Sequence, residues 1–152
     1  MSNLPFGFDE PEESPGFLLW QTTISWQRLI KKALDPYDIS HAQFVIMAIV
    51  LWFSGIKQNP NQILIARQSK LDKMTVSKSL KKLVAQGLIE RTEHKTDTRA
   101  KSVHLTKKGR TLATKLVPII EKIDAQFFSI IGKSNQRSLV KILANLNAKL
   151  QE

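Results

Sequence analysis

The first half of the chain carries two predicted helices. Residues 17–34 have apolar residues at helical spacing, at Phe17, Trp20, Ile24, Ile30 and Leu34. Pro36 should end this helix, because its ring nitrogen has no hydrogen to donate to the backbone. Ser40 and Gln43 then have the spacing of a capping box, and the run FVIMAIVLWF (44–53) predicts a helix that must be buried on nearly every side.

Two shorter helices are predicted in the middle of the chain. Asn61 can cap the first, QILIARQS (62–69). Asp72 can cap the second, KMTVSKSLKKLVAQ (73–86), by accepting a bond from a free amide in its first turn. Gly87 should end the second helix, because the left-handed position after a helix favours glycine. Two helices joined by so few residues indicate a helix-turn-helix.

The pattern changes from a helical to a strand period after Gly87. The segments LIERTEH (88–94) and SVHL (102–105) alternate as strands do, and the polar, basic KTDTRAK (95–101) lies between them. This arrangement predicts a β-hairpin with a long charged tip. Thr106 is placed to cap the helix that follows, and Gly109 would let that helix begin close to a neighbouring backbone.

The last two predicted helices have broad apolar faces. We expect the first to run to Ile131, with a kink at Pro118 and an end at Gly132, and the second to open at Ser134. Apolar residues recur along both at helical spacing: Leu112, Leu116, Ile119, Ile120, Ile123, Phe127, Leu139, Ile142, Leu143, Leu146 and Leu150. A small core cannot cover so much apolar surface, so these helices should form a dimer.

The positive charge of the chain lies in one segment. The net charge is +10, and residues 57–110 hold 14 Lys or Arg against four Asp or Glu, while the remaining residues hold nine of each. A charge added for solubility would be scattered, so its confinement indicates a polyanionic partner, with nucleic acid favoured. An acidic membrane and a merely solvated basic face are the alternatives.

The composition removes several classes of function. There is no cysteine, so disulfides, thiolate metal sites and thiol redox sensing are excluded. The sequence shows no glycine-rich phosphate loop, nucleophile elbow or carboxylate pair, so we expect neither an enzyme nor a bound cofactor. The longest strongly apolar run has ten residues, too short for a bilayer, and no targeting signal is visible, so we expect a cytoplasmic protein with no membrane partner.

The helix over residues 73–86 carries the chemistry of a DNA reader. Its apolar side should pack inward, and its other face carries short hydroxyl groups beside lysines: Lys73, Thr75, Ser77, Lys78, Lys81 and Lys82. Thr75 and Ser77 can reach base edges or phosphates without bulk, while the lysines neutralise phosphate. A solvated lysine face on a structural helix is the alternative.

The predicted hairpin tip is suited to the minor groove of DNA. An arginine on a thin loop can enter that narrow, strongly negative groove, and Arg99 lies between Lys95 and Lys101. Asp97 repels phosphate, so we expect it to hold the loop or the Arg99 guanidinium through a charge-assisted bond. Simple Coulomb repulsion is the competing account, in which Asp97 only weakens DNA binding.

These segments together resemble the MarR family of bacterial and archaeal transcription regulators. The resemblance rests on the helix-turn-helix, QGLIER (86–91), and a D-x-R motif followed by L-T-x-x-G, with Asp97, Arg99, Leu105, Thr106 and Gly109 in place. It covers residues 17–150 at the level of helix order and is specific over 62–109. It implies a winged helix-turn-helix whose N- and C-terminal helices dimerise, and binding of a pseudo-palindromic operator, usually as a repressor.

The resemblance also implies a division of the chain and DNA contacts. We expect a loose acidic tail (1–16), supporting and dimerising helices (17–55), a DNA-binding lobe (56–110) and C-terminal dimerisation helices (111–152). The family's DNA contacts would fall on Thr75, Ser77 and Lys78 and on Arg99. Many relatives release DNA when a small, often phenolic or amphipathic, molecule binds.

Two further residue sets have more than one interpretation from sequence alone. Trp20, Phe44 and Met47, with Trp26 and Trp52, could line a pocket for a small amphipathic or aromatic effector, although aromatics at helical spacing usually form core. His41, His94 and His104 are widely spaced and have no paired carboxylate motif, so we predict no metal site. The alternative functions are an activator or anti-silencer of the same fold, and a basic helical protein that binds membrane or protein.

Overall fold

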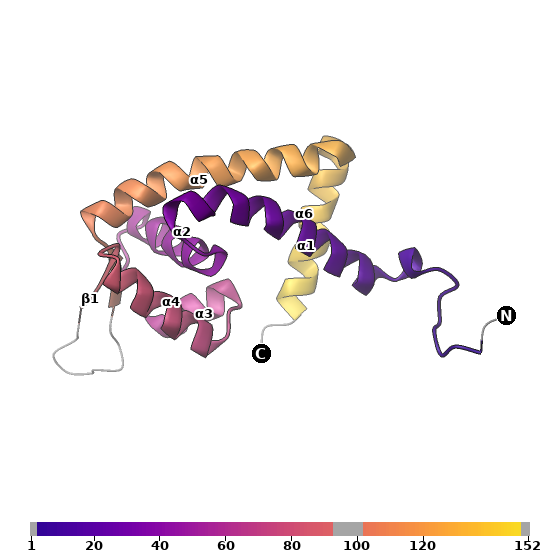
Figure 1. Ribbon diagram of the computed structural model, residues 1–152, viewed down its shortest axis with the longest axis horizontal. Coiled ribbons are helices and arrows are strands. Elements are labelled where there is room, and N and C mark those ends of the chain that lie inside the picture. Colours follow the sequence, from indigo (N-terminus) through magenta and orange to yellow (C-terminus); the bar gives the residue numbers. More distant parts are fainter. Residues whose placement is uncertain (1–2, 93–101, 150–152) are drawn as a thin grey trace.

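A computed structural model of the chain describes residues 3–92 and 102–149 (Figure 1). The elements follow in the order η1 (Pro11–Glu13), α1 (Pro15–Leu34), η2 (Asp35–Tyr37), α2 (His41–Gly55), α3 (Gln62–Ser69), α4 (Lys73–Ala85), β1 (Ile89–Thr92), β2 (Ser102–Leu105), α5 (Lys107–Phe128), η3 (Ser129–Ile131) and α6 (Gly132–Lys149). Helices dominate and a two-stranded hairpin follows the helix-turn-helix, so the predicted winged-helix class is confirmed.

The elements form a compact end around the helix-turn-helix and an extended opposite end. In Figure 1, α5 spans the molecule from the hairpin to α6 and lies along α1, while α3 and α4 lie together below α2. The N-terminal segment and the start of α1 project away from the body. Among the described helices, none alone has the length and apolarity to cross a membrane; only the pair 15–37 and 41–55, bent by 81°, passes by length and composition.

The core is centred on α2, as its apolar sequence predicts. Ile46, Met47 and Val50 have almost no exposed surface and join residues from α1, α3, α4, the hairpin and α5 in one cluster. Trp52 of the same helix is an exception to the expected burial, because it points outward and is largely exposed. The helix is therefore covered on most of its circumference and open along one line.

The predicted helix caps are present. Ser40 and Gln43 form a capping box at the start of α2, and the side chains of Asn61 and Asp72 accept amides in the first turns of α3 and α4. Gly87 has φ +73° after α4, the left-handed conformation that favours glycine. These local signals explain why α3 and α4 begin where the sequence predicts and why α4 ends within one residue of its predicted end.

The boundaries of α1, α5 and α6 differ from the predicted ones. α1 begins at Pro15, not at residue 17, because Ser14 accepts the Phe17 amide and proline suits the first turn. α5 ends at Phe128, and a 3₁₀ turn leads to Gly132, whose φ of +80° redirects the chain. α6 then begins at Gly132 rather than at Ser134, so the break between the two helices is residues 129–131 rather than the predicted 132–133.

The hairpin is joined to both neighbouring helices. Its strands pair antiparallel from Ile89 with Leu105 to Thr92 with Ser102, and the Val103 amide donates to the Pro60 carbonyl at 2.8 Å. The Thr106 hydroxyl donates to the Gly87 carbonyl at 2.6 Å and accepts the Gly109 amide at 3.0 Å, which confirms Thr106 as a cap. These bonds attach the hairpin and the adjoining Thr106 to Gly87, to the first turn of α5 and to the loop before α3.

Candidate nucleic-acid interface

The second helix of the helix-turn-helix, α4, is fixed by its cap and by one apolar face. The Asp72 carboxylate accepts the Thr75 amide at 2.7 Å. Val76, Leu80 and Leu83 are fully buried, and α4 packs against α2 and α3. The opposite face is left open from the first turn onward, where free amides add partial positive charge.

The α4 residues predicted to contact DNA do not share one environment. Lys73, Lys78, Lys81 and Lys82 are exposed or nearly so, whereas Thr75 and Ser77 are half-buried on the flanks of the helix. The Thr75 hydroxyl also donates to Asp72 Oδ2 at 2.9 Å, so it can accept a bond from DNA but has no free hydrogen to donate. The lysines are therefore the more accessible part of the predicted set.

The cap of α4 keeps a negative charge at its N-terminus. The Thr75 amide, and after it the Thr75 hydroxyl, hold the pKa of the Asp72 carboxyl below its usual value. Hydrogen bonds to the ionised form favour that form, so Asp72 stays charged at neutral pH. This charge lowers the positive potential at the very start of the helix, whereas Lys78 and Lys81 lie further along it and are exposed.

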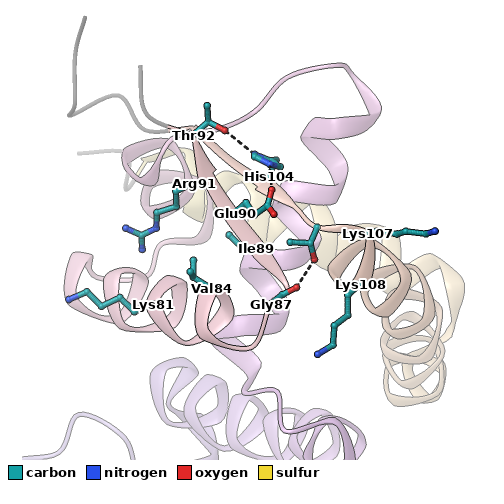
Figure 2. A pocket seen from close by; sticks show the side chains of 11 residues that line it. Lys81, Val84, Gly87, Ile89, Glu90, Arg91, Thr92, His104, Lys107 and Lys108 are labelled. Atoms are coloured by element: carbon teal, nitrogen blue, oxygen red, sulfur yellow. Dashed lines mark hydrogen bonds and ion pairs between the residues drawn. The ribbon is translucent and has the colours of Figure 1, made fainter. Parts of the chain in front are cut away.

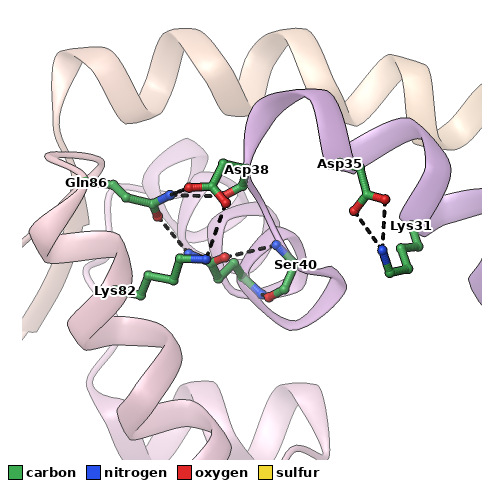
Figure 3. Close-up of polar contacts among 7 residues, drawn as sticks. Lys31, Asp35, Asp38, Ser40, Lys82 and Gln86 are labelled. Atoms are coloured by element: carbon green, nitrogen blue, oxygen red, sulfur yellow. Dashed lines mark hydrogen bonds and ion pairs between the residues drawn. The ribbon is translucent and has the colours of Figure 1, made fainter.

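Lys82 lies on a different side of α4, toward the α1–α2 turn. Its ammonium lies 3.6 Å from Asp38 Oδ1, and both side chains are solvent-accessible (Figure 3). Gln86, one turn further on, donates from Nε2 to the Asp38 carbonyl at 2.9 Å. Gln43 completes this polar cluster: its buried side chain donates from Nε2 to Gln86 Oε1 at 2.7 Å and accepts the Ser40 amide at 2.9 Å. These bonds tie the C-terminal end of α4 to the turn between α1 and α2.

A basic hollow lies between α4, the hairpin and the start of α5. It has a volume of about 850 Å³, and its lining includes Lys81, Arg91, Lys107 and Lys108 (Figure 2). The acidic residue Glu90 also lines the hollow, and its Oε2 atom lies 3.0 Å from Nε2 of His104. Lining residues thus come from three elements that only the fold brings together.

Arg91 is a charged residue of this hollow that the sequence analysis missed. Its Nε and one Nη nitrogen are buried, and neither has a hydrogen-bond partner among the residues that the structure describes. Buried guanidinium nitrogens without a partner are unfavourable unless an anion completes their hydrogen bonds. The position lies within QGLIER, but an arginine in a strand gives no sign of its burial, because burial depends on how α4 and the hairpin pack.

The predicted residues at the hairpin tip lie outside the described residues. They are Lys95, Asp97, Arg99 and Lys101, all between the two strands. The described strand ends nearest to them, Thr92 and Ser102, pair with each other at the end of the hairpin away from α5. The expected roles of the four residues therefore remain predictions.

The three residues predicted for an effector pocket are not brought together. Phe44 and Met47 belong to the core cluster, while Trp20 is 64% exposed on α1 and lies outside that cluster. A different hollow, of about 680 Å³, lies between α1 and the start of α2, and none of the three residues lines it. Its lining includes Ile24, Arg28, His41 and, from α4, Lys82.

His41 lies in an aromatic and acidic contact between α1, α2 and α5. Its ring packs edge-on to Trp26 at 5.1 Å between centroids, and the Trp26 indole donates to Asp124 Oδ1 at 2.7 Å. Burial lowers the pKa of His41, against the opposing effect of the Asp124 carboxylate. Within residues 3–92 and 102–149, no group of three potential ligands is arranged to hold a metal ion, and His94 lies outside that part.

Comparison with known proteins places this geometry in a family. Residues 35–123 match the model of an ArnR1-like winged-helix domain. The chain is 39% identical over 126 residues to the HTH-type transcriptional regulator YdcH of Bacillus subtilis, an uncharacterised protein, covering 83% of this chain and 86% of that one. A mutant MarR from E. coli complexed with operator DNA has the same fold, with a TM-score of 0.75 and 20% identity over 86% of this chain and 91% of that one.

The chain belongs to the MarR family of winged-helix transcription regulators. As a MarR-family protein it is a DNA-binding transcription regulator, and the predicted family is confirmed. CouR from Rhodococcus jostii RHA1, solved bound to p-coumaroyl-CoA, also shares the fold, with a TM-score of 0.78 and 20% identity over 92% of this chain and 96% of that one.

Proposed function

We propose that this MarR-family protein is a homodimeric repressor that binds a pseudo-palindromic operator through α4 and the hairpin. The observation that carries the proposal is the open basic face of α4, where Lys78 and Lys81 are exposed. Lys81 also lines the basic hollow together with Arg91, two of whose nitrogens are buried without a partner among the described residues. Cations in this arrangement neutralise phosphates while the first turns of the helix reach base edges.

The proposed DNA contacts lie on the open face of α4, on Arg91 of β1 and on the tip of the hairpin. The residues proposed to touch DNA are Lys73, Thr75, Ser77, Lys78, Lys81, Arg91, Lys95, Arg99 and Lys101, with Asp97 positioning Arg99. Lys82 is proposed mainly as an orienting residue, because Asp38 already competes for its ammonium. If Lys82 has this orienting role, its loss changes DNA affinity by altering the orientation of α4, not by removing a contact with a phosphate.

The dimer is proposed from the uncovered ends of the chain. No described residue of α6 is buried, although its apolar stripe includes Ile142, 56% exposed, and Leu146, 53% exposed. Phe17, Leu18, Leu19 and Trp20 are likewise exposed at the start of α1. An exposed apolar surface of this extent is typical of a protein interface, and a second copy would cover it.

One experiment tests this function directly. The full-length protein is mixed with a random-sequence duplex pool, the bound DNA is sequenced, and the enriched duplex is titrated beside a random duplex at fixed salt. We expect enrichment of an inverted repeat and binding at two chains per duplex. Enrichment of no sequence, with equal affinity for both duplexes, would contradict the proposal.

The same protein and selected duplex can distinguish two rival functions from the proposed one. An activator would bind the same kind of operator, so only a reporter with the operator placed upstream of or across the promoter distinguishes it from a repressor. A basic protein acting on membranes would bind anionic lipid vesicles and would show no preference among duplex sequences. The basic segment by itself is consistent with binding to either DNA or anionic membranes. The open face of α4 favours duplex DNA.

A ligand response is the second candidate function, and the hollow beside α1 favours it. That hollow is lined by His41 and Arg28 and also by Lys82, so a molecule bound there would touch a residue of α4. We propose that a small amphipathic or aromatic carboxylate binds in it and competes with Asp38 for Lys82. Screening such carboxylates for release of the selected duplex tests the idea, with Arg28→Ala as the variant expected to lose the response.

A further inference from the structure

The outermost line of α4 begins with an apolar residue. Met74, Lys78 and Lys81 are spaced by four and three residues, so they lie along one side of the helix, opposite the buried Val76 and Leu80. Met74 is 68% exposed, although the exposed side chains around it, Lys73, Lys78 and Lys81, are basic.

The position of Met74 on this helix gives it a function that the lysines cannot perform. In a helix-turn-helix, the N-terminal residues of the helix that enters the major groove contact base edges. The side chains beside it, Lys73 and Thr75, are a cation and a hydroxyl whose hydrogen is already bound to Asp72. Met74 is therefore the most outward side chain of the first turn, and it has no hydrogen to donate.

An apolar side chain can distinguish bases in the major groove through one group only. Thymine carries a 5-methyl group there, and the other bases present donors and acceptors that a thioether satisfies poorly. Methionine is unbranched and polarizable, so it can adapt its shape to a methyl group. We propose that Met74 determines part of the operator sequence by packing on a thymine methyl in each half-site; this rests on the proposed entry of α4 into the major groove.

The test removes the methyl group from the DNA and the side chain from the protein in turn. The probe is the duplex that the full-length protein selects from a random pool, with each thymine replaced singly by deoxyuridine, which lacks only the 5-methyl group. For the wild type we expect one thymine per half-site whose replacement weakens binding about fourfold, the effect of burying one methyl-sized group. Met74→Ala should bind the thymine and deoxyuridine duplexes equally at that position, and Met74→Leu should restore most of the difference.

The controls separate this inference from general loss of binding. Alanine and methionine both favour helix, so Met74→Ala should leave the helix content and melting temperature unchanged. Val84→Ala, an exposed apolar residue near the other end of α4, should keep the full response to deoxyuridine. The inference is overturned if Met74→Ala keeps that response at every position, or if no thymine methyl affects the wild type. If no duplex is selected at all, the proposed function itself fails.

Discussion

Gly109 offers a test in which local and tertiary effects predict opposite signs. It lies in the first turn of α5, within the helix. Replacing a helical glycine by alanine normally stabilises the helix by about 1 kcal/mol, because alanine loses less backbone entropy on folding. The surrounding structure predicts that Gly109→Ala destabilises this protein instead.

The reason is the backbone of Leu88, against which α5 begins. A Cβ on Gly109 would lie 2.8 Å from the Leu88 carbonyl carbon, 3.1 Å from its Cα, and closer still to its oxygen. That oxygen accepts the Thr106 amide at 3.1 Å, and the Thr106 hydroxyl donates to Gly87 at 2.6 Å. The clash is with backbone rather than with a flexible side chain, so α5 must move away and strain both bonds.

The expected net effect follows from these losses. Two weakened hydrogen bonds and the overpacking together outweigh the helix gain and leave a destabilisation of about 2–4 kcal/mol. For a chain of this length that corresponds to a fall in melting temperature of roughly 4–16 °C. The measurement is thermal unfolding by circular dichroism at one fixed protein concentration, because dimerisation would make the midpoint depend on concentration.

A second glycine provides the matched control. Gly55 lies at the end of α2, and an added Cβ there meets nothing within 4 Å. Gly55→Ala should therefore leave the melting temperature unchanged or raise it. If Gly109→Ala proves as stable as the wild type, the close approach of α5 to Leu88 is not the reason for glycine at this position.

Three further perturbations test the other parts of the molecule. Gln43→Ala removes the hydrogen bonds to Ser40 and Gln86, so it should lower the free energy of unfolding by about 2–3 kcal/mol. A urea titration measures this loss and should show an unchanged m-value. A loss below ~0.5 kcal/mol would contradict the role of this buried amide. Lys78→Ala should weaken binding to selected and random duplexes alike and reduce the salt slope by roughly one unit, and a loss confined to the selected duplex would show base contact instead. Ile142→Asp on α6 should give monomers in sedimentation at micromolar protein, whereas an unchanged dimer would place the interface elsewhere.

The order and type of most elements could be predicted from sequence because their signals are local. Asn61, Asp72 and Thr106 begin helices by hydrogen bonds within one turn, and Gly87 ends one through its own φ. A cap needs only residues three positions apart, so its sequence pattern is sufficient. The same holds for the charge on residues 57–110 and for the family, whose motifs are contiguous.

The environment of each candidate site residue was decided only by tertiary packing. Lys81 and Lys82 are neighbours in sequence, yet one lines the basic hollow beside Arg91 and the other faces Asp38. The sequence predicts that Thr75 contacts base edges or phosphates, and in the structure its hydroxyl donates to the helix cap Asp72. Met74, which no sequence pattern singled out, is the outermost residue of that turn.

The effector prediction shows the same limit. Aromatic residues at helical spacing can line a pocket or fill a core, and the two cases have the same sequence pattern. The fold separates them, since Phe44 and Met47 pack into the cluster around α2 and Trp20 lies outside it. Burial depends on which helices pack together. That packing is set by contacts between residues far apart in the chain, such as Trp26 with Asp124 and Gln43 with Gln86. A single sequence carries no local signal for such contacts.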